Sequence, residues 1–312
     1  MKEVINILCA TDDNYVPYCG IMLTSVFENN LDVAIDVYIM VDKPLKQANL
    51  EKFSALCARY DSKAIRYILV DPKRFSLFPL LHKKLHFTIA TYYRLAATEF
   101  LPETVDRSLY LDCDIVVNGS LSELWSIPLL GNSAAVIDDM CSGLQSNYER
   151  LCYDNSLRYF NAGVMLINLA YWREHKIMEQ FESYVIQYPK RILWQDQDVL
   201  NAVLLDSKLH VGIEWNYQMG FLKQSYFDTL PERIQEEVLT TSPKIIHYNQ
   251  LKPWNIAYYN FPYYSLWHYY KKKSPWRGLI DKYPKHKRFN YYIKRWLLWP
   301  LGIMTHTDTI KK

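Results

Sequence analysis

Two aspartates one residue apart, Asp112 and Asp114, directly follow the apolar run 108–111. Alternate residues of an extended chain point to the same side, so both carboxylates can converge on one divalent cation at a strand end. Oxygen ligands suit a hard ion such as Mg²⁺ or Mn²⁺, and two carboxylates leave most of its coordination positions open. These positions could bind the diphosphate of a nucleotide. A pair of exposed turn aspartates is the alternative interpretation.

A histidine and a lysine further along the chain offer additional ligands. His247 follows the apolar residues of a short predicted strand, 244–248, and Lys252 comes shortly after it. The imidazole could be a third metal ligand, and the ammonium group could contact a donor phosphate. Taken alone, a histidine at a strand end is more often a hydrogen-bonded structural residue.

The elements that must position these side chains alternate between apolar strands and helices. We expect strands at 4–11, 34–41, 64–70, 107–111, 134–137, 161–169 and 244–248, and helices at 17–30, 44–59, 88–100, 170–187 and 197–205. The initial β-α-β-α-β order predicts a doubly wound α/β sheet. Ligands of such sheets bind at the carboxyl ends of the strands, where Asp12 and Asn14 follow the first strand.

Composition changes near residue 255. Residues 271–312 carry 12 Lys/Arg and 2 Asp/Glu, whereas residues 1–270 carry 24 and 31. We therefore expect a catalytic domain at 1–255 and a mostly helical, basic and aromatic extension at 256–312. The stretch 289–304 is too short to span a bilayer but could lie in a membrane interface, with its basic residues near anionic lipid. A helix packed on the domain is the alternative. Without a binding motif, nucleic acid is not an expected partner.

The cysteines and the N-terminal residues bear on localisation. None of the six cysteines forms a CxxC pair, which favours free thiols in a reducing cytoplasm. The N-terminal residues resemble a first strand more than a signal peptide.

Six segments in order carry a resemblance to a known family. They are ATDDNY at 10–15, TYYRL at 91–95, YLDCDIVV at 110–117, YFNAGVMLINL at 159–169, QDQDVLN at 195–201 and IIHYNQLKPW at 245–254. Together they resemble glycosyltransferase family 8, the retaining galactosyl- and glucosyltransferases of bacterial lipopolysaccharide. The later aromatic and basic stretch up to Trp276 is similar to the C-terminal segment of the lipopolysaccharide core hexosyltransferases.

The resemblance implies a GT-A fold with a Rossmann-like nucleotide-binding mixed sheet, a UDP-sugar donor and a catalytic Mn²⁺, with Mg²⁺ as the alternative ion. It implies Asp112, Asp114 and His247 as metal ligands. These three residues, together with Cys113 between the aspartates, are also implied to bind the donor. The resemblance further implies that Ala10, Asp12 and Asn14 contact the uracil and ribose and that Arg94 contacts the donor. It places Asn161 and Ala162 beside the donor sugar and Lys252 at the diphosphate. The implied catalytic residues around the transferred hexose are Asp138, Asp196 and Gln197, of which Gln197 also binds the donor.

Several of these residues have plainer interpretations. Asp12 could cap the following helix. Arg94 could be an ordinary surface cation, and Asp138 a turn residue. Asp196 lies at the start of an expected helix, where the helix dipole favours acidic residues anyway.

One segment departs from the family pattern. Between His247-Tyr248 and Lys252, the family usually has a glycine-containing segment, whereas this chain has Asn-Gln-Leu, one residue shorter. A glycine lets the backbone approach a phosphate closely. The departure therefore concerns the loop geometry and the contact of Lys252 with the diphosphate.

The expected function is transfer of galactose or glucose, with retention, to a lipid-linked or oligosaccharide acceptor of a bacterial surface glycan, with the lipopolysaccharide core as the expected glycan. The enzyme would be cytoplasmic and peripheral on the inner membrane. Retention follows from the resemblance and could use Gln197 or Asp196 as a nucleophile, or same-face attack by the acceptor. The second route is favoured because an amide is a poor nucleophile. The alternatives are a metal-dependent nucleotide-sugar hydrolase or nucleotidyltransferase, and a non-enzymatic membrane-associated sugar-binding module.

Overall fold

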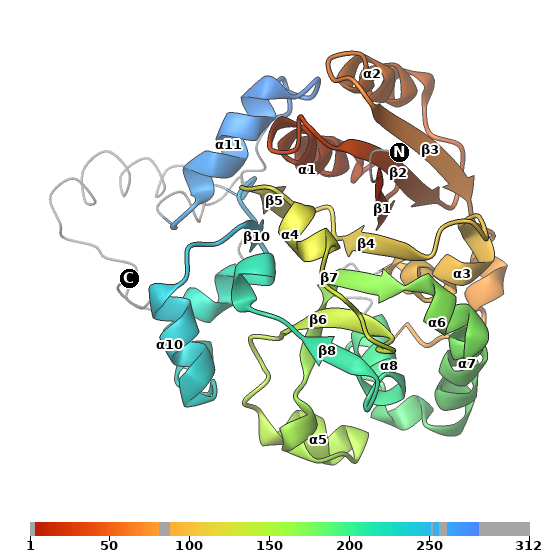
Figure 1. The fold of residues 1–312 in the computed structure, drawn as a ribbon, viewed down its shortest axis with the longest axis vertical. Coiled ribbons are helices and arrows are strands. Elements are labelled where there is room, and N and C mark those ends of the chain that lie inside the picture. The colour runs from red at the N-terminus through yellow and green to blue at the C-terminus, as the bar shows by residue number, and fades with distance from the viewer. Residues whose placement is uncertain (1–3, 81–87, 251, 256–260, 281–312) are drawn as a thin grey trace, which may run out of the picture.

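A seven-stranded sheet in the order β3-β2-β1-β4-β7-β6-β8 forms the centre of the computed structural model, which describes residues 4–80, 88–250, 252–255 and 261–280. The strands are β1 (Val4–Ala10), β2 (Ala34–Val41), β3 (Lys63–Leu69), β4 (Arg107–Leu111), β6 (Ala134–Asp138), β7 (Phe160–Asn168) and β8 (Lys208–His210). Strands β3, β2, β1 and β4 are parallel, and β7 is antiparallel to its neighbours β4 and β6. The predicted α/β sheet is confirmed (Figure 1).

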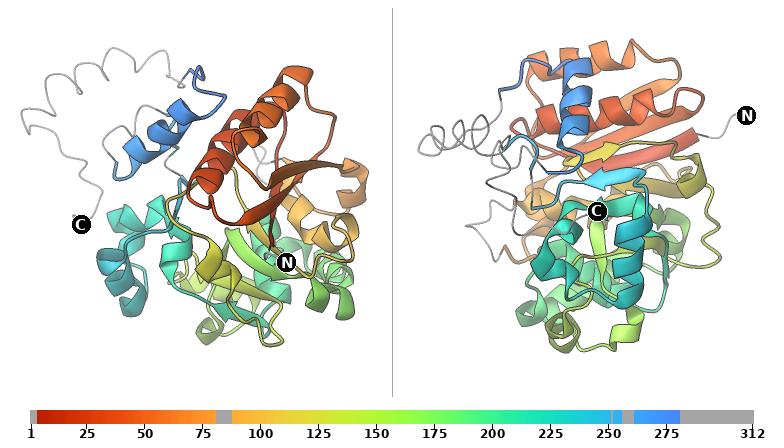
Figure 2. Two further views of the ribbon diagram at one scale, coloured as in Figure 1. Left: turned by 45° about the horizontal axis from the view of Figure 1, so that its top comes forward. Right: turned by 90° about the vertical axis from the view of Figure 1, so that its left-hand side faces the viewer.

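Helices flank this sheet because both faces of its central strands are apolar. In β1, Ile7 belongs to the cluster that includes α1 (Val16–Glu28) and α2 (Gln47–Cys57). Its neighbour Leu8 points the other way, into the cluster with α6 (Leu169–Glu174), α7 (Ile177–Gln187) and α8 (Gln195–Val203). The two views of Figure 2 show the helices on the two sides.

A second, three-stranded sheet has the order β5-β10-β9. Its central strand β10 (Ile245–His247) is antiparallel to β5 (Ile115–Val117) and parallel to β9 (Tyr217–Gln218). The strands β5 and β9 were not predicted, because two or three residues carry no recognisable period. This sheet brings the segment after Asp114 alongside the segment that ends at His247.

Two predicted helices differ in the structure. The segment expected as one helix at 88–100 is a 3₁₀ helix, η3 (Ile89–Ala96), followed by one α-helical turn, α3 (Ala97–Phe100). Residues 92–96 are all buried, which a helix with one apolar face cannot achieve, so tertiary packing overrides the helical pattern. The helix expected to continue to residue 187 is divided into α6 and α7, with Lys176 in the left-handed region between them. The remaining elements are α4 (Ser122–Trp125), α5 (Gln145–Leu151), α9 (Gln224–Phe227), α10 (Glu232–Thr240), η1 (Pro72–Phe75), η4 (Asn155–Leu157), η5 (Pro189–Arg191), η6 (Ile213–Asn216) and η7 (Met219–Leu222).

Part of the C-terminal segment packs onto the body of the protein. Helix α11 (Tyr264–Lys273) lies against α1 (Figures 1 and 2). Its Trp267 is fully buried in the same core as Trp276. No helix among the described residues is long and apolar enough to cross a bilayer. The predicted interfacial stretch 289–304 lies outside the described residues. The division between a domain at 1–255 and an extension at 256–312 stays a prediction.

Candidate metal and donor site

The two aspartates lie where the large sheet connects to the small one. Strand β4 ends at Leu111, and the backbone N–H of Asp112 donates to the carbonyl of Gly163 on β7 at 2.9 Å. The chain then passes through Asp114 into β5, which pairs with β10. Because the carbonyl of Asp114 accepts from the backbone N–H of Tyr248 at 2.9 Å, the adjacent His247 is held beside the aspartates.

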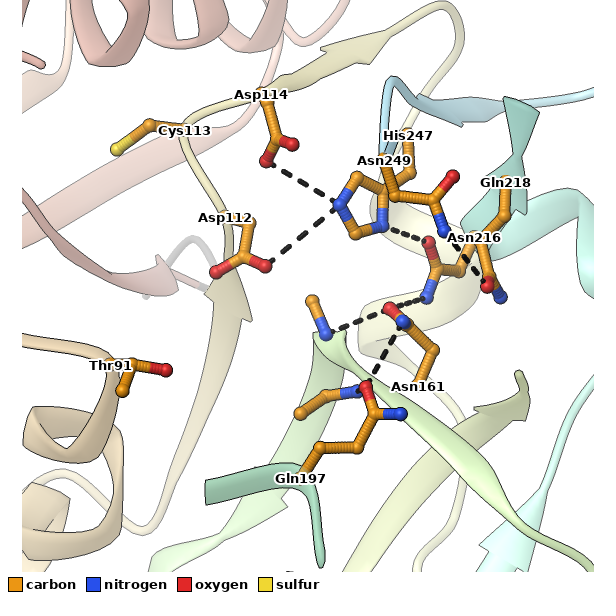
Figure 3. A network of polar contacts seen from close by, with 12 residues as sticks. Thr91, Asp112, Cys113, Asp114, Asn161, Gln197, Asn216, Gln218, His247 and Asn249 are labelled. Atoms are coloured by element: carbon orange, nitrogen blue, oxygen red, sulfur yellow. Dashed lines mark hydrogen bonds and ion pairs between the residues drawn. The ribbon is translucent and has the colours of Figure 1, made fainter. Parts of the chain in front are cut away.

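Three candidate ligand atoms converge from these segments. The Nε2 atom of His247 lies 3.4 Å from Oδ1 of Asp114 and 3.9 Å from Oδ2 of Asp112 (Figure 3). One ligand atom from each residue lies within 4.8 Å of the others. The side chain of His247 is 4% exposed and that of Asp112 is 27% exposed, so the set is anchored in the interior and open on the Asp112 side. This donor set fits one divalent cation with free coordination positions.

Gly163 is the residue that permits this convergence. A Cβ atom at this position would lie 2.8 Å from Oδ2 of Asp112 and would overlap the ring of His247. Strand β7 can therefore pass directly beneath the candidate ligands only without a side chain there.

Arg94 is buried beneath the same aspartates. Its guanidinium contacts Oδ1 of Asp112 at 2.9 Å, Oδ2 of Asp196 at 3.0 Å and the carbonyl of Ala162 at 2.5 Å. It also lies over the ring of Tyr110 at 4.0 Å. Burial opposes its charge, but Asp112 and Asp196 outweigh burial, so the pKa of Arg94 is raised above its ordinary value. At 6% exposure, Arg94 is not a surface cation.

Lys252 makes an ion pair with Oδ2 of Asp114. Burial raises the pKa of the Asp114 carboxyl, but the positive charge of Lys252 is the largest of the effects that outweigh burial and hold that pKa well below its usual range. In the loop before Lys252, Gln250 has φ of 61°, a conformation that glycine adopts more readily. In this shortened loop, a residue other than glycine therefore adopts the left-handed backbone conformation shortly before Lys252, which contacts Asp114.

The predicted sugar-side residues form a second polar cluster. Oε1 of Gln197 accepts from the side chain of Asn161 and from the backbone N–H of Ala162, both at 3.2 Å. Its Nε2 lies 3.3 Å from Asp139 and 3.2 Å from the hydroxyl of Tyr159. Both ends of the Gln197 amide are therefore engaged.

The two predicted acidic catalytic residues lie in different surroundings. Asp196 contacts Arg94 and the hydroxyl of Thr91, and burial raises its pKa to about 6. Asp138 instead lies against Arg158, Arg233 and His210. Burial raises the pKa of Asp138, but His210 and Arg158 outweigh burial and hold that pKa well below its usual range. It is the neighbouring Asp139 that contacts the side chains of both Asn161 and Gln197, at 2.9 and 3.3 Å.

The predicted nucleotide loop lies next to the aspartates because β1 and β4 are adjacent parallel strands. Ala10 ends β1, and its carbonyl accepts from the thiol of Cys113 at 3.2 Å. Oδ1 of Asp12 accepts from the backbone N–H groups of Asn14 and Tyr15 at 2.9 and 2.8 Å. Asp12 thus forms the turn before α1, close to the capping role that the sequence allowed.

Residues 6–257 match the sequence model described as "Glycosyl transferase family 8". The chain belongs to glycosyltransferase family 8. It is 29% identical over 293 residues to a lipopolysaccharide 1,2-glucosyltransferase of Escherichia coli, covering 90% of this chain and 82% of that protein. It is 27% identical over 283 residues to General stress protein A of Bacillus subtilis, covering 89% and 96%. A crystal structure of the galactosyltransferase LgtC in complex with donor and acceptor sugar analogs superimposes with a TM-score of 0.75 at 27% identity, covering 91% of this chain and 99% of that one.

Membership of family 8 confirms the resemblance, the GT-A fold and the enzyme class: the chain is a glycosyltransferase. Enzymes of this family bind a nucleotide-sugar donor and a saccharide acceptor, and GT-A enzymes typically use a divalent metal. The Asp112–Asp114–His247 set is a candidate site for that metal. The alternative of a non-enzymatic sugar-binding module is therefore wrong.

Sequence reasoning missed two residues of this family 8 site. The sequence pointed to Asp138 as a residue around the hexose, but its neighbour Asp139 contacts both Asn161 and Gln197. Asn216, at the end of η6, contacts both His247 and Asn161. Asp139 could have been suspected as the second of two aspartates at a strand end. No local pattern distinguishes Asn216.

Proposed function

We propose that this glycosyltransferase is a retaining hexosyltransferase that transfers galactose or glucose from a UDP-sugar to a saccharide acceptor of a bacterial surface glycan, with the lipopolysaccharide core as the acceptor. The convergence of Asp112, Asp114 and His247 beside the β1 loop carries the proposal. The names of the relatives support it: the Escherichia coli protein acts on lipopolysaccharide with glucose, and LgtC is a galactosyltransferase.

In this proposal Asp112, Asp114 and His247 hold Mn²⁺, with Mg²⁺ as the alternative. The single imidazole favours Mn²⁺, since Mg²⁺ prefers an all-oxygen shell. When bound, the ion supplies positive charge opposite the leaving diphosphate. Ala10, Asp12, Asn14 and Cys113 hold the nucleoside.

Two cationic side chains of the protein, Lys252 and Arg94, add positive charge next to the proposed metal ligands. Lys252 is partly exposed and lies on Asp114, so its ammonium group is within reach of a diphosphate bound there. Arg94 is fixed by Asp112 and Asp196 and orients both carboxylates. Charges held in place before the reaction lower the barrier without reorganising during it.

The side chains around the hexose favour same-face attack by the acceptor. Asp196 is engaged by Arg94 and Thr91, and the amide oxygen of Gln197 accepts two hydrogen bonds. A nucleophile would have to give up these contacts. We therefore assign Gln197, Asn161 and Ala162 to binding of the donor hexose, and Asp196 to holding Arg94. Asp138 is assigned to its ion pairs with Arg158 and Arg233.

The test is UDP release from a panel of UDP-sugars with Mn²⁺ and a saccharide acceptor. Asp114→Asn should abolish turnover, whereas Asp36→Asn, on the distant strand β2, should leave it within twofold of wild type. Unchanged turnover in Asp114→Asn contradicts the metal assignment. Free hexose formed without dependence on acceptor indicates a hydrolase, and released pyrophosphate indicates a nucleotidyltransferase.

We further propose that the enzyme is cytoplasmic and binds the inner-membrane surface through its basic and aromatic C-terminal segment. Lys272, which is exposed at the end of α11, and the basic residues that follow would meet anionic lipid. In liposome flotation, full-length protein should float with anionic vesicles, and replacement of Lys285, Lys287 and Arg288 by glutamine should reduce this. Equal flotation of both proteins contradicts the proposal.

A further inference from the structure

Asn216 lies fully buried between the candidate metal ligands and the sugar-side amides. Its Oδ1 atom is 3.0 Å from Nδ1 of His247, and its Nδ2 atom donates to Oδ1 of Asn161 at 2.9 Å (Figure 3). Which ring nitrogen of His247 carries the proton depends on which end of the Asn216 amide faces it.

The orientation of Asn161 is fixed by a backbone donor on one side and by a carboxylate acceptor on the other. The backbone N–H of Gly163 can only donate, and it points to Oδ1 of Asn161 at 3.0 Å. On the other side, the Asp139 carboxylate accepts from Nδ2 of Asn161 at 2.9 Å. The oxygen of Asn161 must therefore face Gly163 and Asn216.

This orientation propagates to the histidine. Because the oxygen of Asn161 needs a donor, Asn216 must turn its NH₂ group toward it and its own oxygen toward His247. The Nδ1 atom of His247 then has to be the protonated nitrogen. Its Nε2 lone pair is left facing Asp114 and Asp112, at 3.4 and 3.9 Å.

We propose that Asn216 is a positioning residue that holds His247 in its Nδ1–H tautomer and thereby prepares Nε2 as a metal ligand. The same amide ties the metal side of the site to Asn161, and through it to Gln197 and Asp139. The inference rests on the proposed metal site, but the tautomer can be measured without metal. Hydrogen bonds to the second nitrogen of a ligating histidine generally fix its tautomer and orientation in this way.

The first test is the tautomer itself, read from ¹⁵N chemical shifts of the ring in the metal-free full chain at pH 9. The signals of His247 are assigned by their loss in His247→Asn. We expect the Nδ1–H form in wild type. In Asn216→Leu the preference should move to Nε2–H, because the acceptor at Nδ1 is gone while Asp114 and Asp112 still face Nε2. A predominantly Nε2–H ring in wild type, or an unchanged ring in Asn216→Leu, overturns the proposal.

Asn216→Asp serves as a second variant if the leucine variant does not fold. Its carboxylate still accepts from Nδ1 but cannot donate to Asn161, so the Nδ1–H form should persist, and its loss would overturn the proposal. Asn30→Leu is the matched control, since Asn30 is also fully buried and bridges two backbone groups far from the site. It should leave the His247 shifts unchanged, and a change there would also count against the proposal.

The second test is Mn²⁺ affinity measured by electron paramagnetic resonance without nucleotide. We expect Asn216→Leu to weaken binding by about 10- to 100-fold, the usual effect of losing such a support. Equal affinity in Asn216→Leu and wild type overturns the positioning role. An Nδ1–H ring in a wild-type protein that binds no Mn²⁺ would instead sink the metal assignment and leave the role of Asn216 in the tautomer standing.

Discussion

The ammonium group of Lys252 lies on the carboxylate of Asp114, although the two residues are 138 positions apart in the chain. A cation of the protein therefore already balances a carboxylate that is proposed to bind the metal. Because the Lys252 side chain is 32% exposed, it is accessible from solvent to a diphosphate bound beside Asp114.

Lys252→Met should affect metal and nucleotide in opposite directions. Without the competing ammonium group, Mn²⁺ alone should bind up to about fivefold more tightly, which corresponds to ~1 kcal/mol for a partly exposed ion pair. UDP in the presence of Mn²⁺ should bind more weakly, because its diphosphate loses a cation. Calorimetric titration measures both, with Lys244→Met, from the ion pair with Glu123, as the control. Weaker Mn²⁺ binding in Lys252→Met would show that Lys252 does not compete with the ion.

Gly163→Ala should disable the site while leaving the sheet intact. The added methyl group would press on Oδ2 of Asp112 and on the His247 ring, so the three ligand atoms could no longer converge. Misplacement of a site by about 1 Å can cost on the order of 100-fold in rate. We expect a comparable loss of turnover with near-wild-type circular dichroism. Gly119→Ala, where the new Cβ would make only ordinary contacts with Lys244, is the matched control.

Arg94→Leu should be strongly destabilising. It leaves Asp112 and the buried Asp196 without their shared cation, and loss of one member of a buried ion pair typically costs about 3–5 kcal/mol. The exposed pair of Arg66 with Asp36 provides the comparison, and Arg66→Leu should cost less than about 1 kcal/mol. Urea unfolding gives both values, and similar costs for the two variants would contradict the structural role of Arg94.

Asp196 should make stability fall as pH rises between about 4 and 6. Its carboxyl has a pKa of about 6 in the folded protein because it is buried, against 3.8 for the free group. Below this window the carboxyl is protonated in both states. Between about pH 4 and pH 6, the Asp196 carboxyl is ionised in the unfolded chain but still protonated in most folded molecules. The free energy of unfolding therefore decreases with each increase in pH.

The measurement is the free energy of unfolding of wild type minus that of Asp196→Asn. Between pH 4 and pH 7 this difference should fall by on the order of 2–3 kcal/mol. Subtracting the variant removes the titration of all other groups that the two proteins share. A difference that does not change with pH would show that the Asp196 carboxyl titrates normally.

Much of the fold was predictable because its signals are local. The apolar runs of β1, β2 and β4 and the helices between the first strands lie where the hydrophobic pattern put them. The departures have a common cause. Residues 92–96 are buried on all sides of their segment, and β5 and β9 are too short to show a period, so only their packing partners define them.

In the candidate site, too, some residues could be predicted from local sequence and others could not. Asp112 and Asp114 could be singled out because two carboxylates directly after an apolar strand form a local pattern. The sequence could not decide between Asp138 and Asp139. Alternation along a strand places neighbouring side chains on opposite sides of the sheet but does not say which side faces Gln197. In the structure that side belongs to Asp139.

By itself, the sequence determined the α/β class, the strand ends that carry polar groups and, through six segments in order, the similarity to family 8. Only the tertiary structure decided that β5 and β10 join Asp114 to His247, that Arg94 is buried between two carboxylates, and that Asn216 links the two halves of the site. The physical reason is the range of the interactions. Apolar periodicity acts over one element, whereas a hydrogen bond between residues far apart in the chain exists only after strand pairing has brought them together.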